Sequence, residues 1–191
     1  QLGYDDLKNN YYDFGFTKPI SINFPSSSFG YMNIKDEVSD KELASLGYGY
    51  GLTVSPFQIA SAYSVFANDG IYKDFKLLLN EEVTSRRVIS NESAIYVLEA
   101  LRKVVKEGTG KGAEILGFSE GGKTGTVHKI KRGAGYAEDL YRASFIGITP
   151  LNEQSLTIFV SIDEPGLNAY SGGAVAAPLF AKIAESSLNH L

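Results

Sequence analysis

The segment Gly122-Lys123-Thr124-Gly125-Thr126 combines one ammonium group with two hydroxyl groups within five residues. A lysine presents three N–H donors, and each threonine hydroxyl both donates and accepts. Such a set of donors suits an anion, either a phosphate or a carboxylate. The backbone around the lysine distinguishes the two, because a phosphate is held at a helix N-terminus whereas an extended ligand lies along a strand.

The phosphate hypothesis rests on the eight residues from Gly117 to Thr124, which fit the loop pattern G-x-x-x-x-G-K-[ST]. The apolar run 156–162 ends in Asp163, as the magnesium-holding strand of a nucleotide hydrolase does. A phosphate loop must open a helix, but Lys123 is followed by β-branched residues and a glycine, which favour a strand. A nucleotide hydrolase is therefore kept only as the alternative function.

Composition and charge narrow the function classes. The chain has 191 residues, of which 43% are apolar and 21% charged, as in an ordinary globular domain. Its net charge of −4 offers no basic surface for nucleic acid. With no cysteine, only two histidines and no spaced acidic cluster, we expect neither a metal site nor a cofactor. The chain opens on Gln1 within a helical pattern, so we expect a fragment of a longer protein.

Helical signals dominate the first part of the chain. Ser55-Pro56 combines a capping serine with a proline in the first turn, and the turn residues 68–70 end that helix. Ser90 caps a second helix whose apolar residues recur every three and four positions, and Gly108 ends it. Weaker signals predict helix near 2–16 and 36–46, an extended piece at 21–28 and a tight turn at 47–51.

The last third is predicted to form a sheet. Its strand candidates, 123–130, 140–149 and 156–163, are joined by links too short for a helix, so they should be antiparallel neighbours. Helical spacing returns at 174–188. Helices gathered on an antiparallel sheet make an α+β fold.

A strand through Lys123 would give the anion-binding residues a common direction. Thr124 and Thr126 would leave one face, with Gly125 between them. Their hydroxyls and the ammonium could converge on a substrate carboxylate, and Gly125 would let an extended peptide lie against the strand. The backbone N–H near Thr126 could help to stabilise an oxyanion. The plainer interpretation is a strand with incidental threonines.

Further segments resemble, in order, the transpeptidase domain of penicillin-binding proteins, and most of all its division-type class B (FtsI-like) branch. These segments are GYG at 49–51, VSPFQIA at 54–60, ANDG at 67–70, GTG at 108–110, GKTGT at 122–126, YRASF at 141–145, IDEP at 162–165 and GGAVAAP at 172–178. The resemblance covers essentially the whole chain. It implies a penicillin-binding α+β fold, with residues 1–191 as the C-terminal part of a single transpeptidase domain.

The resemblance implies a peptidoglycan D,D-transpeptidase. In this family a serine attacks the penultimate D-alanine carbonyl of a stem peptide, releases terminal D-alanine and passes the acyl group to an amine, and β-lactams trap the acyl-enzyme. Lys123 would support catalysis. Substrate binding would fall to Lys123, Thr124, Gly125, Thr126, His128, Tyr50 and Tyr170. The implied partners are stem peptides, β-lactam antibiotics and membrane proteins of the division complex, with no nucleic acid. The implied location is the periplasm, with an N-terminal tether to the inner membrane.

The chain departs from the family in its nucleophile. The family needs S-x-x-K for the serine and base, and no such pattern occurs in the sequence. Its S-x-N motif is matched by spelling at Ser21-Ile22-Asn23 and Ser187-Leu188-Asn189, and we interpret both matches as chance. We therefore expect both motifs upstream of Gln1 and an inactive isolated chain. A non-catalytic sensor of penicillin or cell-wall peptide is the third hypothesis.

Overall fold

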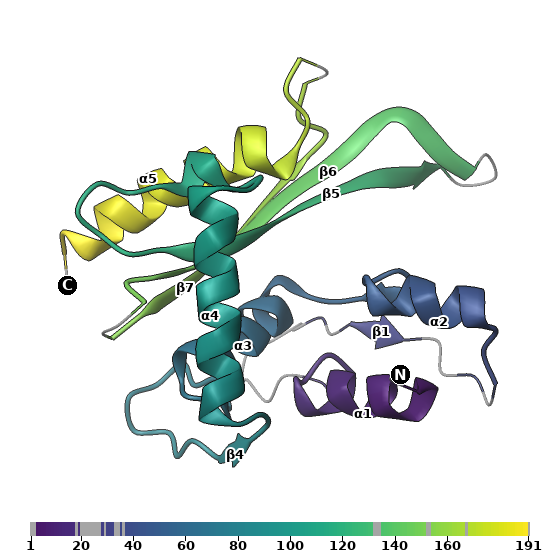
Figure 1. Ribbon diagram of the computed structural model, residues 1–191, viewed down its shortest axis with the longest axis horizontal. Helices are drawn as coiled ribbons and strands as arrows, with labels where there is room; N and C mark the ends of the chain where they lie inside the picture. The colour runs from purple at the N-terminus through teal and green to yellow at the C-terminus, as the bar shows by residue number, and fades with distance from the viewer. Residues whose placement is uncertain are drawn as a thin grey trace. The chain divides into compact units, whose positions relative to one another are not determined.

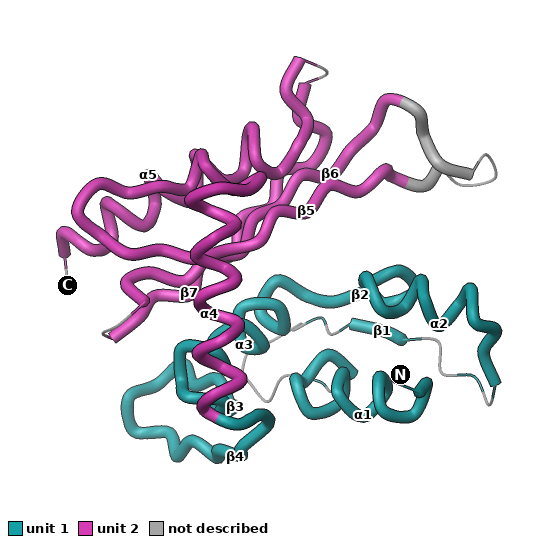
Figure 2. Tube along the Cα trace, in the orientation of Figure 1, with its two compact units in different colours: residues 1–90 teal, residues 91–191 magenta. Residues whose placement is uncertain are grey.

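The computed structural model describes residues 3–17, 19, 28, 30–32, 35, 37–131, 135–151, 154–166 and 168–190. It divides the chain into two compact units, Gln1–Ser90 and Asn91–Leu191 (Figure 2). Each unit has its own helices and strands (Figure 1). That both units belong to one transpeptidase domain stays a prediction.

The first unit is mostly helical. It contains α1 (Tyr4–Asp13), β1 (Tyr31–Met32), α2 (Asp40–Gly47), β2 (Leu52–Thr53), α3 (Pro56–Ala67), β3 (Ile71–Lys73) and β4 (Ser85–Arg87). β1 pairs with β2, and β3 pairs with β4, both antiparallel. The helices expected near 2–16 and 36–46 correspond to α1 and α2, while the extended piece expected at 21–28 lies outside the described residues apart from Ser28.

α3 begins as its sequence predicts. The Ser55 hydroxyl accepts the N–H of Gln58, and Pro56 occupies the first turn. The tight turn expected at 47–51 is also present, with Gly49 and Gly51 at φ values of 93° and 82°. These left-handed conformations suit glycine, because a side chain would strain them.

Gln58 ties three segments of the first unit together from a buried position. Its amide oxygen accepts the N–H groups of Gly30 and Ser55, at 2.7 and 2.9 Å. Its amide nitrogen donates to the carbonyls of Gly15 and Phe16, at 3.1 and 3.0 Å. Buried polar groups are stable when they are bonded in this way, so one side chain holds the end of α1, the approach to β1 and the start of α3.

The second unit is built on a three-stranded sheet in the order β5-β6-β7 (Figure 1). Its elements are α4 (Asn91–Lys106), the 3-10 turn η1 (Lys111–Ala113), β5 (Gly121–Lys131), β6 (Gly135–Thr149), β7 (Leu156–Asp163), the π-helical turn η2 (Gly172–Ala176) and α5 (Ala177–Leu188). Both strand pairs are antiparallel, which confirms the predicted topology. The helix expected at 174–188 differs at its start, because the turn η2 leads into α5.

The core of this unit lies where the sheet meets its helices. Phe145 of β6 and Phe180 of α5 are fully buried, with ring centroids 5.0 Å apart. The next residue, Ile146, is also buried although it leaves the opposite face, so β6 is covered on both faces as expected. A Cβ at Gly147 would lie 2.5 Å from the Phe180 ring, so glycine allows α5 to pack closely on the sheet.

We predict that Gln58→Leu lowers the free energy of unfolding by about 3 kcal/mol or more, because two N–H groups and two carbonyls lose their partner in a buried place. Urea unfolding measures the change. Gln154→Leu makes the same substitution at an exposed position and should change the free energy by less than about 0.5 kcal/mol. Equal effects of the two substitutions would contradict the role assigned to Gln58.

Candidate active site

The predicted anion-binding residues lie in the first half of β5, which is an outer strand of the described sheet. Thr124 and Thr126 share the face that carries Phe145 of the neighbouring strand. Lys123 leaves the other face and is exposed. Its Nζ donates to the carbonyl of Thr124 at 2.9 Å. The ammonium is thus drawn back to the strand backbone that carries the two hydroxyls.

The same strand contradicts the phosphate-loop hypothesis. β5 continues from Gly121 through Lys123 to Lys131, so no helix N-terminus follows the lysine. Asp163, the proposed magnesium ligand, ends β7 in an ion pair with Lys129, whose Nζ is 2.7 Å from its Oδ2. Arg142 also binds Asp163, at 3.0 Å. The nucleotide-hydrolase alternative is therefore wrong for this backbone.

Each threonine hydroxyl of β5 meets a second segment. The Thr126 Oγ1 accepts the N–H of Gly172 at 3.0 Å, and the Thr124 Oγ1 lies 2.8 Å from the Thr109 Oγ1. Neither Thr109 nor Gly172 was predicted from the sequence to be a site residue. Both lie in the glycine-rich segments at 108–110 and 172–178, so the only available signal was the order of those segments along the chain.

Close packing explains the glycines of the site. A Cβ at Gly172 would lie 2.3 Å from the carbonyl oxygen of Ser144 and 2.6 Å from that of Gly125, so η2 can approach β5 only with glycine at this position. A Cβ at Gly125 would lie 2.5 Å from the Ser144 Oγ. Gly125 was predicted to make room for a ligand. The structure adds a neighbour in β6 that needs the same space.

Three aromatic rings pack in a row that begins with His128 of β5. His128 lies 4.4 Å from Tyr141 between ring centroids, and Tyr141 stacks on Tyr170 at 4.3 Å with an interplanar angle of 25°. The structure thus brings the predicted residues His128 and Tyr170 together through Tyr141, which sequence reasoning missed. Its signal is register, because Tyr141 faces His128 in the ladder.

Tyr50 belongs to the other unit. Its ring packs edge-on against Tyr48 at 5.5 Å, and it lines a hollow of about 220 Å³ with Leu46 and Lys35. A place for Tyr50 in the substrate site stays a prediction.

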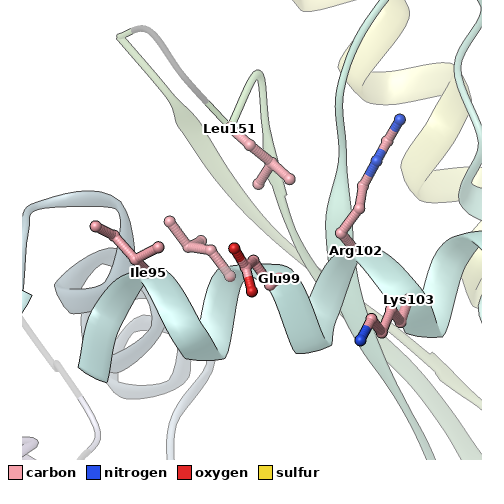
Figure 3. Close-up of a pocket in the computed structure, with 6 residues that line it drawn as sticks. Ile95, Glu99, Arg102, Lys103 and Leu151 are labelled. Atoms are coloured by element: carbon pink, nitrogen blue, oxygen red, sulfur yellow. The ribbon is translucent and has the colours of Figure 1, made fainter. Parts of the chain in front are cut away.

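A separate hollow of about 430 Å³ lies on α4 and contains none of the predicted site residues (Figure 3). It is lined by Ile95, Leu98, Glu99, Arg102, Lys103 and Leu151. Arg102 of this lining also donates to the Glu120 Oε1 at 2.7 Å and to the Glu120 carbonyl at 3.0 Å. Burial raises the pKa of the Glu120 carboxyl, and the Arg102 charge opposes that shift. This pair ties α4 to the start of β5.

The described part of the chain shows how the possible metal-binding side chains are distributed. Within it, His, Asp and Glu side chains form no group of three or more that could hold a metal ion. In the same described residues, no helix has the length and apolar character that crossing a membrane requires.

Residues 1–185 match the family described as the penicillin binding protein transpeptidase domain. The chain belongs to this family. The chain is 37% identical over 179 residues to the probable peptidoglycan D,D-transpeptidase PbpC of Pseudomonas aeruginosa. The match covers 93% of this chain and 32% of that protein. The chain therefore spans about a third of the length of this relative.

Solved structures agree on the fold. The transpeptidase domain of Burkholderia pseudomallei penicillin-binding protein 3 superposes with a TM-score of 0.89 at 33% identity, covering 99% of this chain and 58% of that one. Mycobacterium tuberculosis penicillin-binding protein 3 in complex with aztreonam gives a TM-score of 0.85 at 28% identity, covering 99% and 47%. The α+β fold is thus that of penicillin-binding transpeptidases. The names of these relatives give no support to a sensor.

The ion pairs of Asp163 with Lys129 and Arg142 can be tested by titrating the Asp163 carboxyl. The hydrogen bond from Lys129, followed by that from Arg142, holds the pKa of the Asp163 carboxyl below its ordinary value of 3.8. A carboxyl group whose pKa is lowered by folding stabilises the folded state at pH values above its ordinary pKa. This contribution is lost as the pH falls through the folded-state pKa. We predict that Lys129→Met raises the pKa of Asp163 toward 3.8.

The measurement is an NMR titration of the Asp163 carboxyl carbon. Lys182→Met, on the exposed surface of α5, is the matched control and should leave this pKa unchanged. An unchanged pKa in Lys129→Met would mean that the Lys129 pair does not persist in solution.

Proposed function

We propose that this chain is the carboxylate-binding part of a peptidoglycan D,D-transpeptidase, and that Lys123, Thr124 and Thr126 hold the carboxylate of the donor stem peptide. The observation that carries the proposal is the arrangement on β5. Two hydroxyls share one face of an outer strand, and the ammonium lies 2.9 Å from the backbone between them. The printed name of PbpC, a D,D-transpeptidase, supports the reaction class.

The hydroxyl of Thr126 is suited to an anion by its internal bond. A backbone N–H can only donate, so the Thr126 oxygen accepts from Gly172 and keeps its own proton for another acceptor. A carboxylate is such an acceptor. Lys123 adds charge-assisted hydrogen bonds, which are stronger than neutral ones. An anion at this place therefore meets donors that are already fixed by the fold.

The outer edge of β5 would receive the peptide itself. An extended chain can add to an exposed strand edge through main-chain hydrogen bonds. In this arrangement the backbone N–H near Thr126 would help to stabilise the oxyanion that forms when the carbonyl is attacked. The row of rings formed by His128, Tyr141 and Tyr170 would be a wall beside the acyl site, with Tyr170 43% exposed. Tyr50 is assigned to a second wall by resemblance alone.

The remaining parts of the reaction lie outside this sequence in our proposal. The serine nucleophile, its base and the S-x-N motif would come from a preceding part of the protein. β-Lactams would acylate that serine, and the aztreonam complex of the Mycobacterium tuberculosis relative supports this class of inhibitor. A periplasmic location, an inner-membrane tether and partners in the division complex belong to the same proposal and rest on the resemblance.

We predict that Lys123→Ala, in the full-length protein, slows acylation by a fluorescent penicillin by about one to two powers of ten, because a charged hydrogen-bond partner contributes roughly 1.5–3 kcal/mol. Thr126→Val should also slow acylation. The measurement is the second-order rate constant for covalent labelling. Lys182→Ala on α5 is the matched control and should label at the wild-type rate.

The isolated 191-residue chain should remain unlabelled, because it has no S-x-x-K serine. Labelling of the isolated chain, or a wild-type rate for Lys123→Ala, would contradict the proposal. A full-length protein that binds penicillin reversibly and forms no covalent adduct would support the sensor hypothesis instead.

A further inference from the structure

Thr109 places a third hydroxyl at the carboxylate site, from a segment outside the sheet. It lies between the end of α4 and η1, and its Oγ1 is 2.8 Å from the Oγ1 of Thr124. The Thr109 side chain is exposed and that of Thr124 is half-buried, so a ligand can reach this pair. The established family membership assigns no role to Thr109 in this chain.

The backbone of Thr109 is held from two sides. After α4, the N–H groups of Gly108 and Gly110 both donate to the carbonyl of Val104, at 3.1 and 3.0 Å. On the other side η2 packs so closely that a Cβ at Gly173 would lie 2.2 Å from the Thr109 carbonyl oxygen. The backbone that carries the Thr109 side chain is therefore held by the packing of α4 and η2.

The chemistry of a carboxylate decides which hydroxyl donates. A carboxylate oxygen only accepts, so Thr124 must donate its single proton in order to bind one. The bond between the two threonines must then be donated by Thr109. A row of hydroxyl groups that ends on an anion is polarised in one direction, and each bond strengthens the next. The N–H of Gly172 likewise donates to the Thr126 Oγ1, at 3.0 Å, so the Thr126 proton can be donated to a ligand.

We propose that Thr109 is a positioning residue of the carboxylate site. Its hydroxyl donates to Thr124 and leaves the Thr124 proton directed at the substrate carboxylate. This inference rests on the proposed function, since it needs a carboxylate on β5. It deepens that function by giving the site a means of distinguishing an anionic ligand from a neutral one, because only the anion makes full use of the polarised row.

The test uses the full-length protein with two ligands, a penicillin and its methyl ester. Thr109→Val keeps the shape of the side chain and removes the hydroxyl. Acylation by the carboxylate form should fall about 5- to 10-fold, whereas acylation by the ester should change by less than about 2-fold. Thr109→Ser keeps the hydroxyl and should restore the carboxylate rate to within about 2-fold of wild type. Thr109→Ala, checked by thermal unfolding, replaces the valine variant if that variant does not fold.

A double-mutant comparison identifies the route of the effect. Because Thr109 is proposed to act through Thr124, the pair Thr109→Val/Thr124→Val should be no slower than Thr124→Val alone. Equal losses with acid and ester, failure of Thr109→Ser to restore the rate, or additive losses in the double variant would each overturn the inference.

Failure of the inference is distinguishable from failure of the proposed function. If Lys123→Ala slows acylation and Thr109→Val does not, the carboxylate site stands and only the role of Thr109 is wrong. If the wild-type full-length protein forms no acyl-enzyme, the proposed function fails and the inference fails with it.

Discussion

The close contact between η2 and β5 at Gly172 is the constraint on which the site depends. With a side chain at this position, the Cβ would lie 2.3 Å from the Ser144 carbonyl oxygen, so η2 would have to move away from the sheet. That movement would take the Gly172 N–H away from Thr126 and the Gly173 backbone away from Thr109. The placement of the Thr126 and Thr109 hydroxyls therefore depends on the same close approach of the η2 backbone.

The far end of β5 carries exposed ion pairs instead of a close backbone contact. The register between β5 and β6 shifts between His128 and Ile130, and Lys129 at this shift reaches across to Asp163 and Glu164, at 2.7 and 2.6 Å. Exposed pairs of this kind contribute little to stability. They lie directly after His128, whose ring packs on Tyr141. Close packing thus lies at the hydroxyl end of the site, and exposed ion pairs lie at its aromatic end.

Local signals explain how much of this could be predicted from the sequence. The start of α3 followed from Ser55-Pro56, and the strand through Lys123 followed from β-branched residues, because both depend on neighbours in the chain. The contact of Thr109 with Thr124 spans 15 positions, and its existence depends on how α4 ends and where η2 packs. For the same reason Tyr141 was missed, because register with His128 exists only once the ladder has formed. The π-helical start of the last helix likewise has no local signature.

In the proposed function, the carboxylate-binding strand and the nucleophile lie apart in sequence, so binding energy would have to align the two. Interactions with a group remote from the reacting carbonyl accelerate acylation only if they hold that carbonyl in the geometry of attack. A loose set of donors would bind the carboxylate and leave the carbonyl free to turn. The hydroxyls of β5 are instead held by η2 and by the end of α4 before any ligand arrives. In the proposed reaction, this fixed placement would convert recognition of an anion into orientation of the bond to be broken.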